Sequence, residues 1–344
     1  MHDTKVTVSP HEARMLGVRA LMQAGVSETD SELQVELLLE AELRGRPSHG
    51  LQRLPRIVER IHNGVTSPTA RGTWHWRGTA LLDVDGEAGL GPVVAVDALG
   101  RISARARETG VAAACIRNNN HLGMLAFYAE RIAAQGQAII ALSTSEALVH
   151  PWGGRKAMIG TNPVAIGVPA TPTPFVLDMA TSLVSMGEIH AYAYRGQALA
   201  TGWALDADGN ATTDAEAAKA GAIAPFGGAK GYALGLAFEV LVASLTASAL
   251  GTDVRGTLDS DQYCNKGDVF IVIDTASNNV AASISAYLDA IRACPPADPQ
   301  KPVAVPGDRA AIQRARSLQA GLALPASIWS RLTELAAPNT PSTL

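Results

Sequence analysis

Short apolar runs alternate with helical patterns through the middle of the chain, and this alternation limits the possible folds more than any other feature. Runs at 80–84, 111–116 and 137–144 have the length and composition of buried strands. The intervening segments at 92–108 and 122–134 carry apolar residues at helical spacing. Interleaved strands and helices indicate an α/β or α+β protein built on a central sheet.

The ends of the chain are predicted to be mainly helical. Three helices precede Pro68, and the third follows Ser48-His49-Gly50 and ends near Asn63, so the chain begins with a helical block. The remaining elements are strands at 164–168, 175–177 and 268–274, helices at 9–25, 28–44, 179–194 and 280–293, a helix after 227–231, and two final helices that begin near 307 and 325.

The usual nucleotide-binding motifs are missing. After Gly89 and Gly91, Val94 stands where the third glycine of a GxGxxG motif belongs. No P-loop occurs either. Any nucleotide site in this chain must therefore differ from a Rossmann site.

Composition narrows the function and the compartment. The net charge of −4 and the aromatic content of 5% both disfavour nucleic-acid binding. Cys115, Cys264 and Cys294 form no CxxC pair, which predicts a reduced, cytoplasmic protein without structural zinc. No spacing predicts another metal site, and we expect a plain turn rather than a calcium loop at 205–210. The N-terminus lacks the apolar stretch of a secretion signal.

Residues 231–250 are long enough to cross a membrane and contain a single charge, Glu239. Glycine, serine and threonine dilute the run, and a central charge is costly in lipid. We therefore expect a fully buried helix of a large domain, and no membrane contact.

Ser48-His49-Gly50 lies between two predicted helices, with Arg53 one helical turn beyond His49 and Arg56 after it. A histidine can donate a proton to a developing alkoxide, and an arginine can bind a carboxylate through two hydrogen bonds. A 2-oxo acid reductase needs this pairing. The plainer interpretation is a serine cap, a partly buried histidine and solvated arginines.

Two strand ends carry polar residues. Asn118-Asn119-Asn120-His121 follows the strand at 111–116, and it can orient a substrate or a nicotinamide amide, or form a turn that caps a helix. Asp178 ends a strand, where its carboxylate can orient a histidine or cap the next helix. His150 and His190 are isolated, and we expect both to be structural.

The loop at 227–231 combines glycines with Lys230 at a helix start. Backbone N–H groups at a helix start, together with a lysine, suit a phosphate. A second, weaker candidate of the same kind lies at 153–156.

Several short motifs occur in one order over nearly the whole chain, and together they resemble the malate/L-lactate dehydrogenase family. That family also contains sulfolactate, ureidoglycolate and 2,3-diketogulonate enzymes and cyclic imine reductases. The motifs are Ser48-His49-Gly50 with Arg53, Asn120-His121-Leu122-Gly123, Gly160-Thr161-Asn162-Pro163, Asp178-Met179-Ala180-Thr181-Ser182, Gly202-Trp203-Ala204-Leu205-Asp206, Gly228-Ala229-Lys230-Gly231 and Pro306-Gly307-Asp308.

The resemblance implies a non-Rossmann fold of the sulfolactate/malate dehydrogenase kind, with a mixed central sheet and an N-terminal helical block. It implies a homodimer with its active site near the subunit interface. Residues 1–75 would form the helical region, 76–120 and 296–344 a dimerisation and substrate region, and 121–295 the cofactor-binding domain.

The resemblance also implies a nicotinamide cofactor, NAD or NADP, bound by strand ends and by the loop before a helix. The cofactor-binding residues it implies are Asn120, Ser143, Thr161, Asp178, Met179, Ala180, Thr181, Ser182, Lys230, Gly231, Pro306, Gly307 and Asp308.

For the reaction, the resemblance implies hydride transfer between the nicotinamide and C2 of a small 2-hydroxy or 2-oxo acid. His49 would be the acid or base on the substrate oxygen, with Ser48, Arg53 and His121 around the substrate. Family members differ in which histidine has the central role, so both stay candidates. Asp178 would fix an imidazole tautomer or polarise the nicotinamide side, and Arg56 or Lys266 would bind the second charge of a dianion.

Two positions depart from the family pattern, because Ala229 replaces a usual histidine and Glu188 a frequent lysine. The first can alter contacts to a cofactor phosphate, and we expect the second at the surface. Segment 251–268 is most like the sulfolactate and malate branch, so 3-sulfolactate ranks first and malate second. A cyclic imine (piperideine- or pyrroline-2-carboxylate) reductase, a ureidoglycolate dehydrogenase and, least favoured, a non-enzymatic binding protein stay open.

Overall fold

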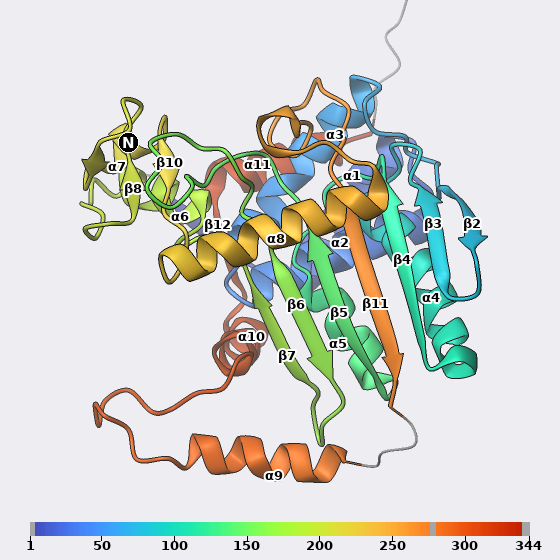
Figure 1. Ribbon diagram of the computed structural model, residues 1–344. Helices are drawn as coiled ribbons and strands as arrows, with labels where there is room; N and C mark the ends of the chain where they lie inside the picture. The colour runs from blue at the N-terminus through green and yellow to red at the C-terminus, as the bar shows by residue number, and fades with distance from the viewer. Residues whose placement is uncertain (1–3, 276–279, 339–344) are drawn as a thin grey trace, which may run out of the picture.

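The computed structural model describes residues 4–275 and 280–338. Residues 1–3, on which part of the expectation about the N-terminus rests, and the last residues of the predicted region 296–344 lie outside the described residues. A central sheet carries helices on both faces, a helical block adjoins it, and a small lobe lies to one side (Figure 1).

The centre of the molecule is a seven-stranded sheet in the order β2-β3-β4-β11-β5-β6-β7 (Figure 1). β3 pairs with β4 in parallel and the other neighbouring strands pair antiparallel, so the predicted mixed sheet is confirmed. The strands are β2 Thr73–Arg77, β3 Leu81–Asp85, β4 Val111–Arg117, β5 Gln137–Ser143, β6 Val164–Val168, β7 Phe175–Met179 and β11 Asp268–Asp274. The sequence did not predict β2, because its mainly exposed residues form no apolar run.

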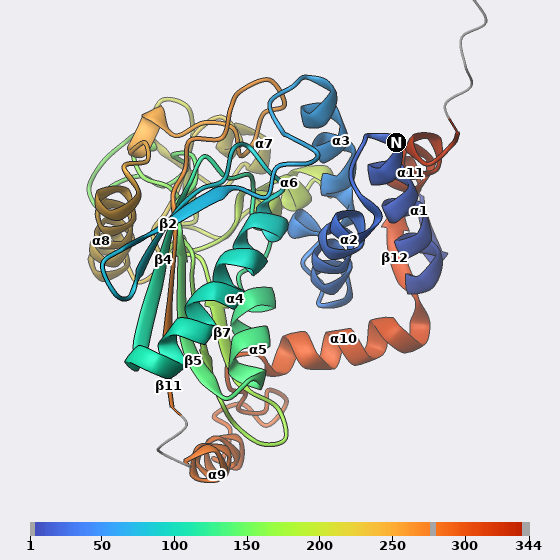
Figure 2. The same ribbon diagram turned by 90° about the vertical axis from the view of Figure 1, so that its right-hand side faces the viewer.

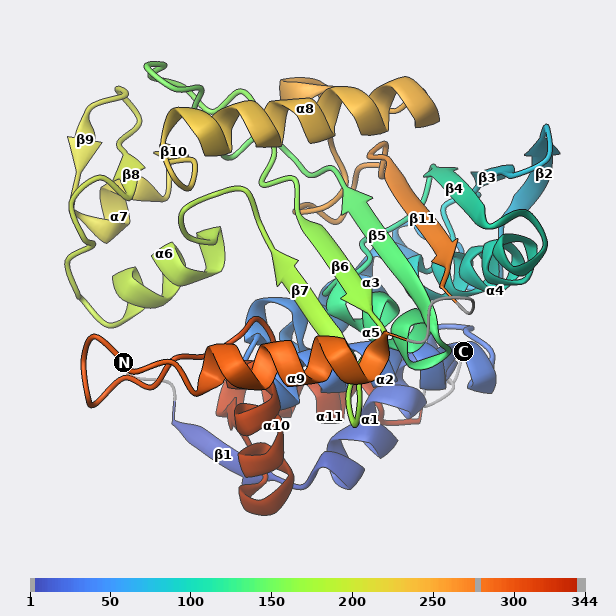
Figure 3. The ribbon, with the colours of Figure 1, turned by 60° about the horizontal axis from the view of Figure 1, so that its bottom comes forward.

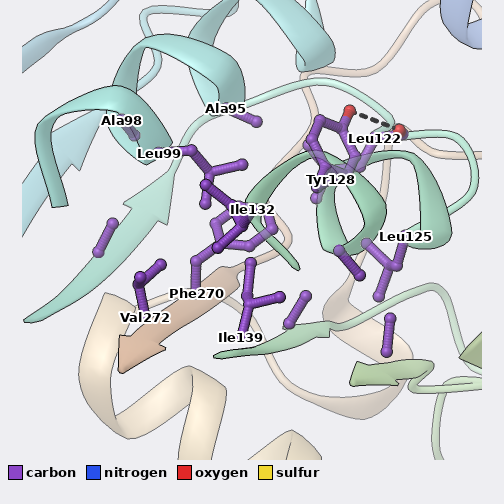
Figure 4. Close-up of a cluster of buried hydrophobic side chains, with 14 of the residues drawn as sticks. Ala95, Ala98, Leu99, Leu122, Leu125, Tyr128, Ile132, Ile139, Phe270 and Val272 are labelled. Atoms are coloured by element: carbon purple, nitrogen blue, oxygen red, sulfur yellow. Dashed lines mark hydrogen bonds between the residues drawn. The ribbon is translucent and has the colours of Figure 1, made fainter. Parts of the chain in front are cut away.

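Helices α4 Gly91–Thr109 and α5 Ala126–Ala134 cover one face of the sheet (Figure 2). Ile132 and Phe270 are among the side chains that join these helices to the strands (Figure 4). Tyr128 donates a hydrogen bond from its hydroxyl to the carbonyl oxygen of Leu122 at 2.7 Å. This bond fixes the segment between β4 and α5, which carries the predicted asparagines and histidine.

Helix α8 Ala229–Thr246 lies across the other face of the sheet (Figure 2). The prediction that this segment is fully buried is wrong, because only 33% of the helix is buried and Val240 and Leu241 are exposed. Within the described residues it is the one helix long and apolar enough to cross a membrane. Its buried Glu239 accepts hydrogen bonds from the N–H of Gly160 and the amide of Asn162, so the helix is tied to the loops of the sheet.

The predicted N-terminal helical block is present, and the C-terminal part of the chain completes it. Ser9 and Ser27 cap the first two helices through their side chains. Strand β1 pairs with β12, and their side chains join one core with the helices. The elements are β1 Lys5–Val8, α1 Pro10–Gln23, α2 Glu28–Leu43, the 3₁₀ turns η1 Pro47–His49 and η2 Leu51–Arg53, α3 Leu54–His62, β12 Leu322–Pro325 and α11 Ala326–Leu335.

Most of the remaining elements form the small lobe and a peripheral arm (Figure 3). They are α6 Met186–Tyr194, β8 Ala204–Leu205, β9 Ala211–Thr212, α7 Ala215–Ala218, β10 Ala222–Ile223, α9 Ala281–Arg292 and α10 Asp308–Ala320. The 3₁₀ turn η3 Gly251–Asp253 follows α8.

The predicted starts of α5 and α6 are too early. Gly123 has a φ of +70°, which a continuing helix does not allow, so α5 begins at Ala126 rather than near 122. The segment after β7 instead binds neighbouring loops, and α6 begins at Met186 under the cap of Ser185 rather than near 179.

Candidate active site

The predicted site segments meet along one edge of the central sheet. Strands β3, β4, β5 and β7 run in one direction, and β6 and β11 run in the opposite direction (Figure 1). The ends of the first group therefore lie beside the beginnings of the second. This arrangement brings together the segments at 118–121, 143–145, 161–163, 178–182 and 266–268.

His49 and His121 lie together, as the sequence analysis required. Their rings are stacked, with centroids 5.4 Å apart and planes 16° from parallel. The turn that carries His49 is held by Glu42, whose Oε2 accepts a hydrogen bond from the N–H of Leu51 at 3.0 Å. A Cβ at Gly50 would lie 2.0 Å from the same oxygen, so a larger residue next to His49 would displace the carboxylate of Glu42.

Both imidazoles are neutral in this arrangement. Burial, followed by the charges of Arg53 and Arg46, lowers the pKa of His49 to about 3. Burial and the charge of Arg53 also hold the pKa of His121 well below its usual value. The N–H of Gly123 donates to Nδ1 of His121 at 2.9 Å, which leaves the ring proton on Nε2. Nδ1 of His49 is buried and has no partner among the described residues.

Three arginines follow His49 on one helical face, and they differ in what they bind. Arg53 donates from Nε to the carbonyl oxygen of Ser48 at 2.8 Å and from Nη1 to that of Thr257 at 3.2 Å. Arg60 is buried and bonds Asn120 and the carbonyl of Asp259. Arg56 has no hydrogen bond or ion pair in the described part of the chain, so its guanidinium is available to a ligand.

Asn120 is engaged within the protein. Its Oδ1 accepts hydrogen bonds from Arg60 and Thr66, and its Nδ2 donates to the carbonyl oxygens of Ala88 and Gly89. The side chain therefore holds the glycine-rich turn after β3 against the helical block, and it has no free donor for a cofactor.

Lys266 is also engaged. Its ammonium contacts both carboxylate oxygens of Asp268 at 2.5 Å, and Ser143 donates to the same carboxylate at 2.6 Å. Lys266 and Asp268 are 2% and 0% exposed, so each compensates the charge of the other inside the protein. Of the two cations predicted for a second anionic group, the free one is Arg56.

Asp178 bonds a helix start, but the prediction that it caps the next helix is wrong, because Ser185 caps α6. Its Oδ2 accepts a hydrogen bond from the N–H of Ala126 at 2.9 Å, at the first turn of α5. Burial raises the pKa of this carboxyl, against the charge of Arg46. In the described residues it bonds no histidine, and the helix it caps precedes it in the chain.

The predicted cofactor segments lie side by side. Thr181 donates from its hydroxyl to the carbonyl of Thr161 at 2.9 Å, and the N–H of Phe226 donates to the carbonyl of Thr181. Ser182 bonds Val184, and Met179 and Ala180 are half-buried. These contacts bring the segment at 178–182 against the loop that opens α8.

The start of α8 suits an anionic group. No side chain caps its N-terminus, and Lys230 is exposed without a partner among the described residues. Ala229 and Glu188 are both exposed, as expected for Glu188. A Cβ at Gly231 would lie 1.7 Å from the carbonyl oxygen of Phe226, so glycine lets this loop close tightly.

The turn at 306–308 adjoins β7. A Cβ at Gly307 would lie 3.2 Å from the carbonyl of Val176, and Pro306 is exposed. Asp308 bonds Arg292 and the N–H of Val305, and the arginine lowers the pKa of this carboxyl. Asp308 therefore anchors the turn rather than offering a free carboxylate.

Sequence reasoning missed two residues that shape the site. Oε1 of Glu146 accepts hydrogen bonds from the backbone and hydroxyl of Thr257 and from the N–H of Leu258, which holds this loop over Arg53. Glu146 follows β5 in a polar run, so the strand-end argument used for His121 could have identified it. Gln34, on α2, lines a cavity beside His121 and gave no comparable signal.

Paired neutral histidines beside arginines can exchange a proton with a carboxylate-bearing substrate. This chemistry, on a mixed, non-Rossmann sheet, fits an oxidoreductase of 2-hydroxy acids. The model of the malate/L-lactate dehydrogenase family matches residues 8–333, and the chain belongs to that family. The predicted fold, the enzyme class and a nicotinamide cofactor, NAD or NADP, are thereby confirmed.

Individual relatives cover nearly the whole chain. A malate/(S)-sulfolactate dehydrogenase of Methanothermus fervidus is 31% identical, covering 96% of this chain and 97% of its own. A (2R)-3-sulfolactate dehydrogenase (NADP(+)) of Chromohalobacter salexigens is 33% identical, covering 94% of this chain and 96% of its own. A Δ1-pyrroline-2-carboxylate reductase of Ancylobacter novellus is 32% identical, covering 97% of this chain and 98% of its own. A solved dehydrogenase structure from Sinorhizobium meliloti is 54% identical with a TM-score of 0.94, covering 97% of this chain and 99% of the other.

Proposed function

We propose that the protein transfers hydride reversibly between a nicotinamide and C2 of a small dianionic 2-hydroxy or 2-oxo acid, with His49 and His121 on the substrate oxygen. The observation that carries this proposal is the stacked pair of neutral imidazoles beside Arg53. The bound cofactor supplies or accepts the hydride. The chain's own residues hold the carboxylate, move the proton and exclude water.

The two histidines have different roles in this proposal. His121 carries its proton on Nε2 and receives the Gly123 N–H on Nδ1, so it is a neutral donor that polarises the substrate oxygen. His49 has an unpartnered Nδ1 and can take up a proton. A substrate carboxylate on Arg53 offsets one of the charges that lower the pKa of His49, so binding favours the imidazolium that then protonates the oxygen.

The cofactor would lie along the sheet edge between the segment at 178–182 and the start of α8. The uncapped helix start and Lys230 would receive phosphate oxygens, and Thr161, Gly231 and the turn at 306–308 would border the cofactor. Ser143, which donates a hydrogen bond to Asp268, would lie beside the cofactor. Asn120 would contribute indirectly, because it holds the turn after β3. Asp178 would position α5 and the segment that carries His121.

The substrate ranking stays 3-sulfolactate, then malate. Names of the relatives at 31% and 33% identity support it, and so does the free guanidinium of Arg56. The similar Δ1-pyrroline-2-carboxylate reductase favours reduction of a cyclic imine as the second candidate. Kinetics with sulfopyruvate, oxaloacetate, pyruvate, ureidoglycolate and piperideine-2-carboxylate separates these; preference for the imine or for pyruvate would overturn the ranking.

The proton-transfer roles are tested by His49→Asn and His121→Asn. General acid–base catalysis typically contributes about 10²–10⁴-fold, so each variant should lose turnover on that scale while keeping its cofactor affinity. His75→Asn is the matched control, because that side chain is 70% exposed on β2. Near-normal turnover by His49→Asn would refute its role as the proton carrier.

We also propose a cytoplasmic homodimer whose interface includes the outer face of α8. Leu234, Leu236, Val240 and Leu241 are 36–53% exposed on this one helix. A contiguous apolar face of this kind marks an interaction surface. Because Lys230 lies in the first turn of α8, dimerisation would hold the cofactor loop at the subunit interface.

A further inference from the structure

A cavity extends from the candidate active site into the helical block. His121 and Arg53 line it at one end, and it continues between α2 and α3. Gln34, Leu37 and Leu38 line it from one face of α2, at the spacing of adjacent helical turns. The cavity is therefore continuous with the place where the substrate oxygen would lie.

Gln34 is the exceptional residue in this cavity. It is 2% exposed, yet its side-chain amide has no hydrogen-bond partner within the described residues. The buried Gln137 shows the ordinary arrangement, since it accepts from the hydroxyl of Ser103 and donates to the carbonyl of Ser103. Within the described residues, this amide is not one of the fully enclosed unpaired groups, so it borders the open space of the cavity, where a ligand can bind it.

The opposite wall supplies a free charge. Arg56 and Ile57 line the cavity from α3, and Leu90 contributes a further apolar surface. Arg53 and Arg60 bind backbone carbonyls of the loop at 257–259, whereas Arg56 binds nothing in the described chain. One free guanidinium and one free amide therefore face a cavity whose other walls are largely apolar.

We propose that Gln34 is a specificity-determining residue that, with Arg56, holds the second anionic group of the substrate. This assignment rests on the proposed function, in which Arg53 and the histidines bind C1 and C2. The guanidinium compensates the charge, and the amide N–H of Gln34 donates a second hydrogen bond. Leu38 and Ile57 shield the carbon between the two ends from water. The site selects acids longer than pyruvate that end in a carboxylate or sulfonate.

Steady-state kinetics of Gln34→Leu tests the assignment. Losing a hydrogen bond to a charged group should raise KM for oxaloacetate and sulfopyruvate about 10- to 100-fold. KM for pyruvate and kcat should change less than about threefold. Gln34→Glu should raise the same two KM values further by repulsion, and Gln52→Leu, on the exposed side of η2, should behave like the wild type.

Calorimetric titration separates this inference from the proposed function. Succinate and propionate resemble malate and lactate without the reacting oxygen, so their binding does not depend on hydride transfer. The wild type should bind succinate more tightly than propionate, and Gln34→Leu should reduce the difference. Equal behaviour of Gln34→Leu and Gln52→Leu in both assays would overturn the assignment. Gln34-dependent succinate binding without turnover would support the subsite while refuting the proposed function.

Discussion

At the scale of single residues, the site combines groups that are costly to bury. His49 and His121 are kept neutral by burial and by neighbouring cations, and the unpaired Nδ1 of His49 is a further cost. Lys266 and Asp268 show the opposite solution, because each buried charge has its partner. The unpaired Nδ1 of His49 is thus left without a partner in the described chain, and a bound substrate can supply one.

These histidines make stability depend on pH. Their pKa values are lowered in the folded state, so below about pH 6.5 the unfolded chain binds protons that the folded chain rejects. The free energy of unfolding should therefore fall as the pH drops from 6.5 to 5, by about 1–2 kcal/mol for His49 and in the same direction for His121. Well above pH 6.5 the histidines are neutral in the unfolded chain too, so they no longer make the free energy of unfolding depend on pH.

Urea unfolding at pH 5 and pH 7 measures this effect in the wild type, His49→Asn and His75→Asn. His49→Asn should lose less stability on acidification than the wild type, and His75→Asn should behave like the wild type. The raised pKa values of the Glu42 and Asp178 carboxyls act in the opposite direction, and the comparison between variants cancels them. Parallel curves for all three proteins would contradict a buried neutral His49.

At the scale of elements, the sequence was most informative at strand ends. The strand at 111–116 and the polar residues after it were predicted correctly, since a short apolar run and its termination are local features. The ion pair between Lys266 and Asp268 could also have been predicted, because side chains two residues apart in an extended chain point to the same face. The sequence could not predict that Gln34 and Arg56 line the same cavity, since this depends on how two helices pack.

The helix starts were predicted less well for a related reason. The positive φ of Gly123 and the hydrogen bonds of Thr181 prevent a helix at these positions, although the helical spacing of apolar residues continues through them in the sequence. The exposed face of α8 could not be predicted either, because an apolar sequence does not tell a buried helix from one that packs on another subunit. The predicted division into 1–75, 76–120 with 296–344, and 121–295 remains a hypothesis, in which the boundary at 120 falls within one sheet.

The start of α8 allows a test at this scale. In Gly231→Ala, the new methyl group would overlap the Phe226 carbonyl, so the loop must move and unfolding should become easier by ~1–3 kcal/mol. KM for the nicotinamide should rise in parallel. Gly100→Ala is the matched control, because a Cβ there meets nothing within 4 Å on helix α4, and it should stabilise by ~0.5–1 kcal/mol. Unchanged cofactor KM in Gly231→Ala would remove this loop from the proposed cofactor site.

At the scale of the whole molecule, the two faces of the sheet are covered to different depths. Helices α4 and α5 bury one face together with α2, whereas α8 covers the other face as a single layer (Figure 2). The apolar residues on the outer side of α8 are then left to solvent in one chain. A second copy would bury them and hold Lys230, at the start of the same helix, in a fixed position.

Val240→Asp combined with Leu241→Asp tests this assembly. Two carboxylates on the exposed side of α8 would be desolvated in a dimer, so sedimentation velocity should show a monomer where the wild type is dimeric. Ile312→Asp is the control, because that side chain is 53% exposed on α10, and it should remain dimeric. The monomer should also bind the nicotinamide more weakly, since its loop at 227–231 loses support. A dimer that survives both substitutions would place the interface on another surface.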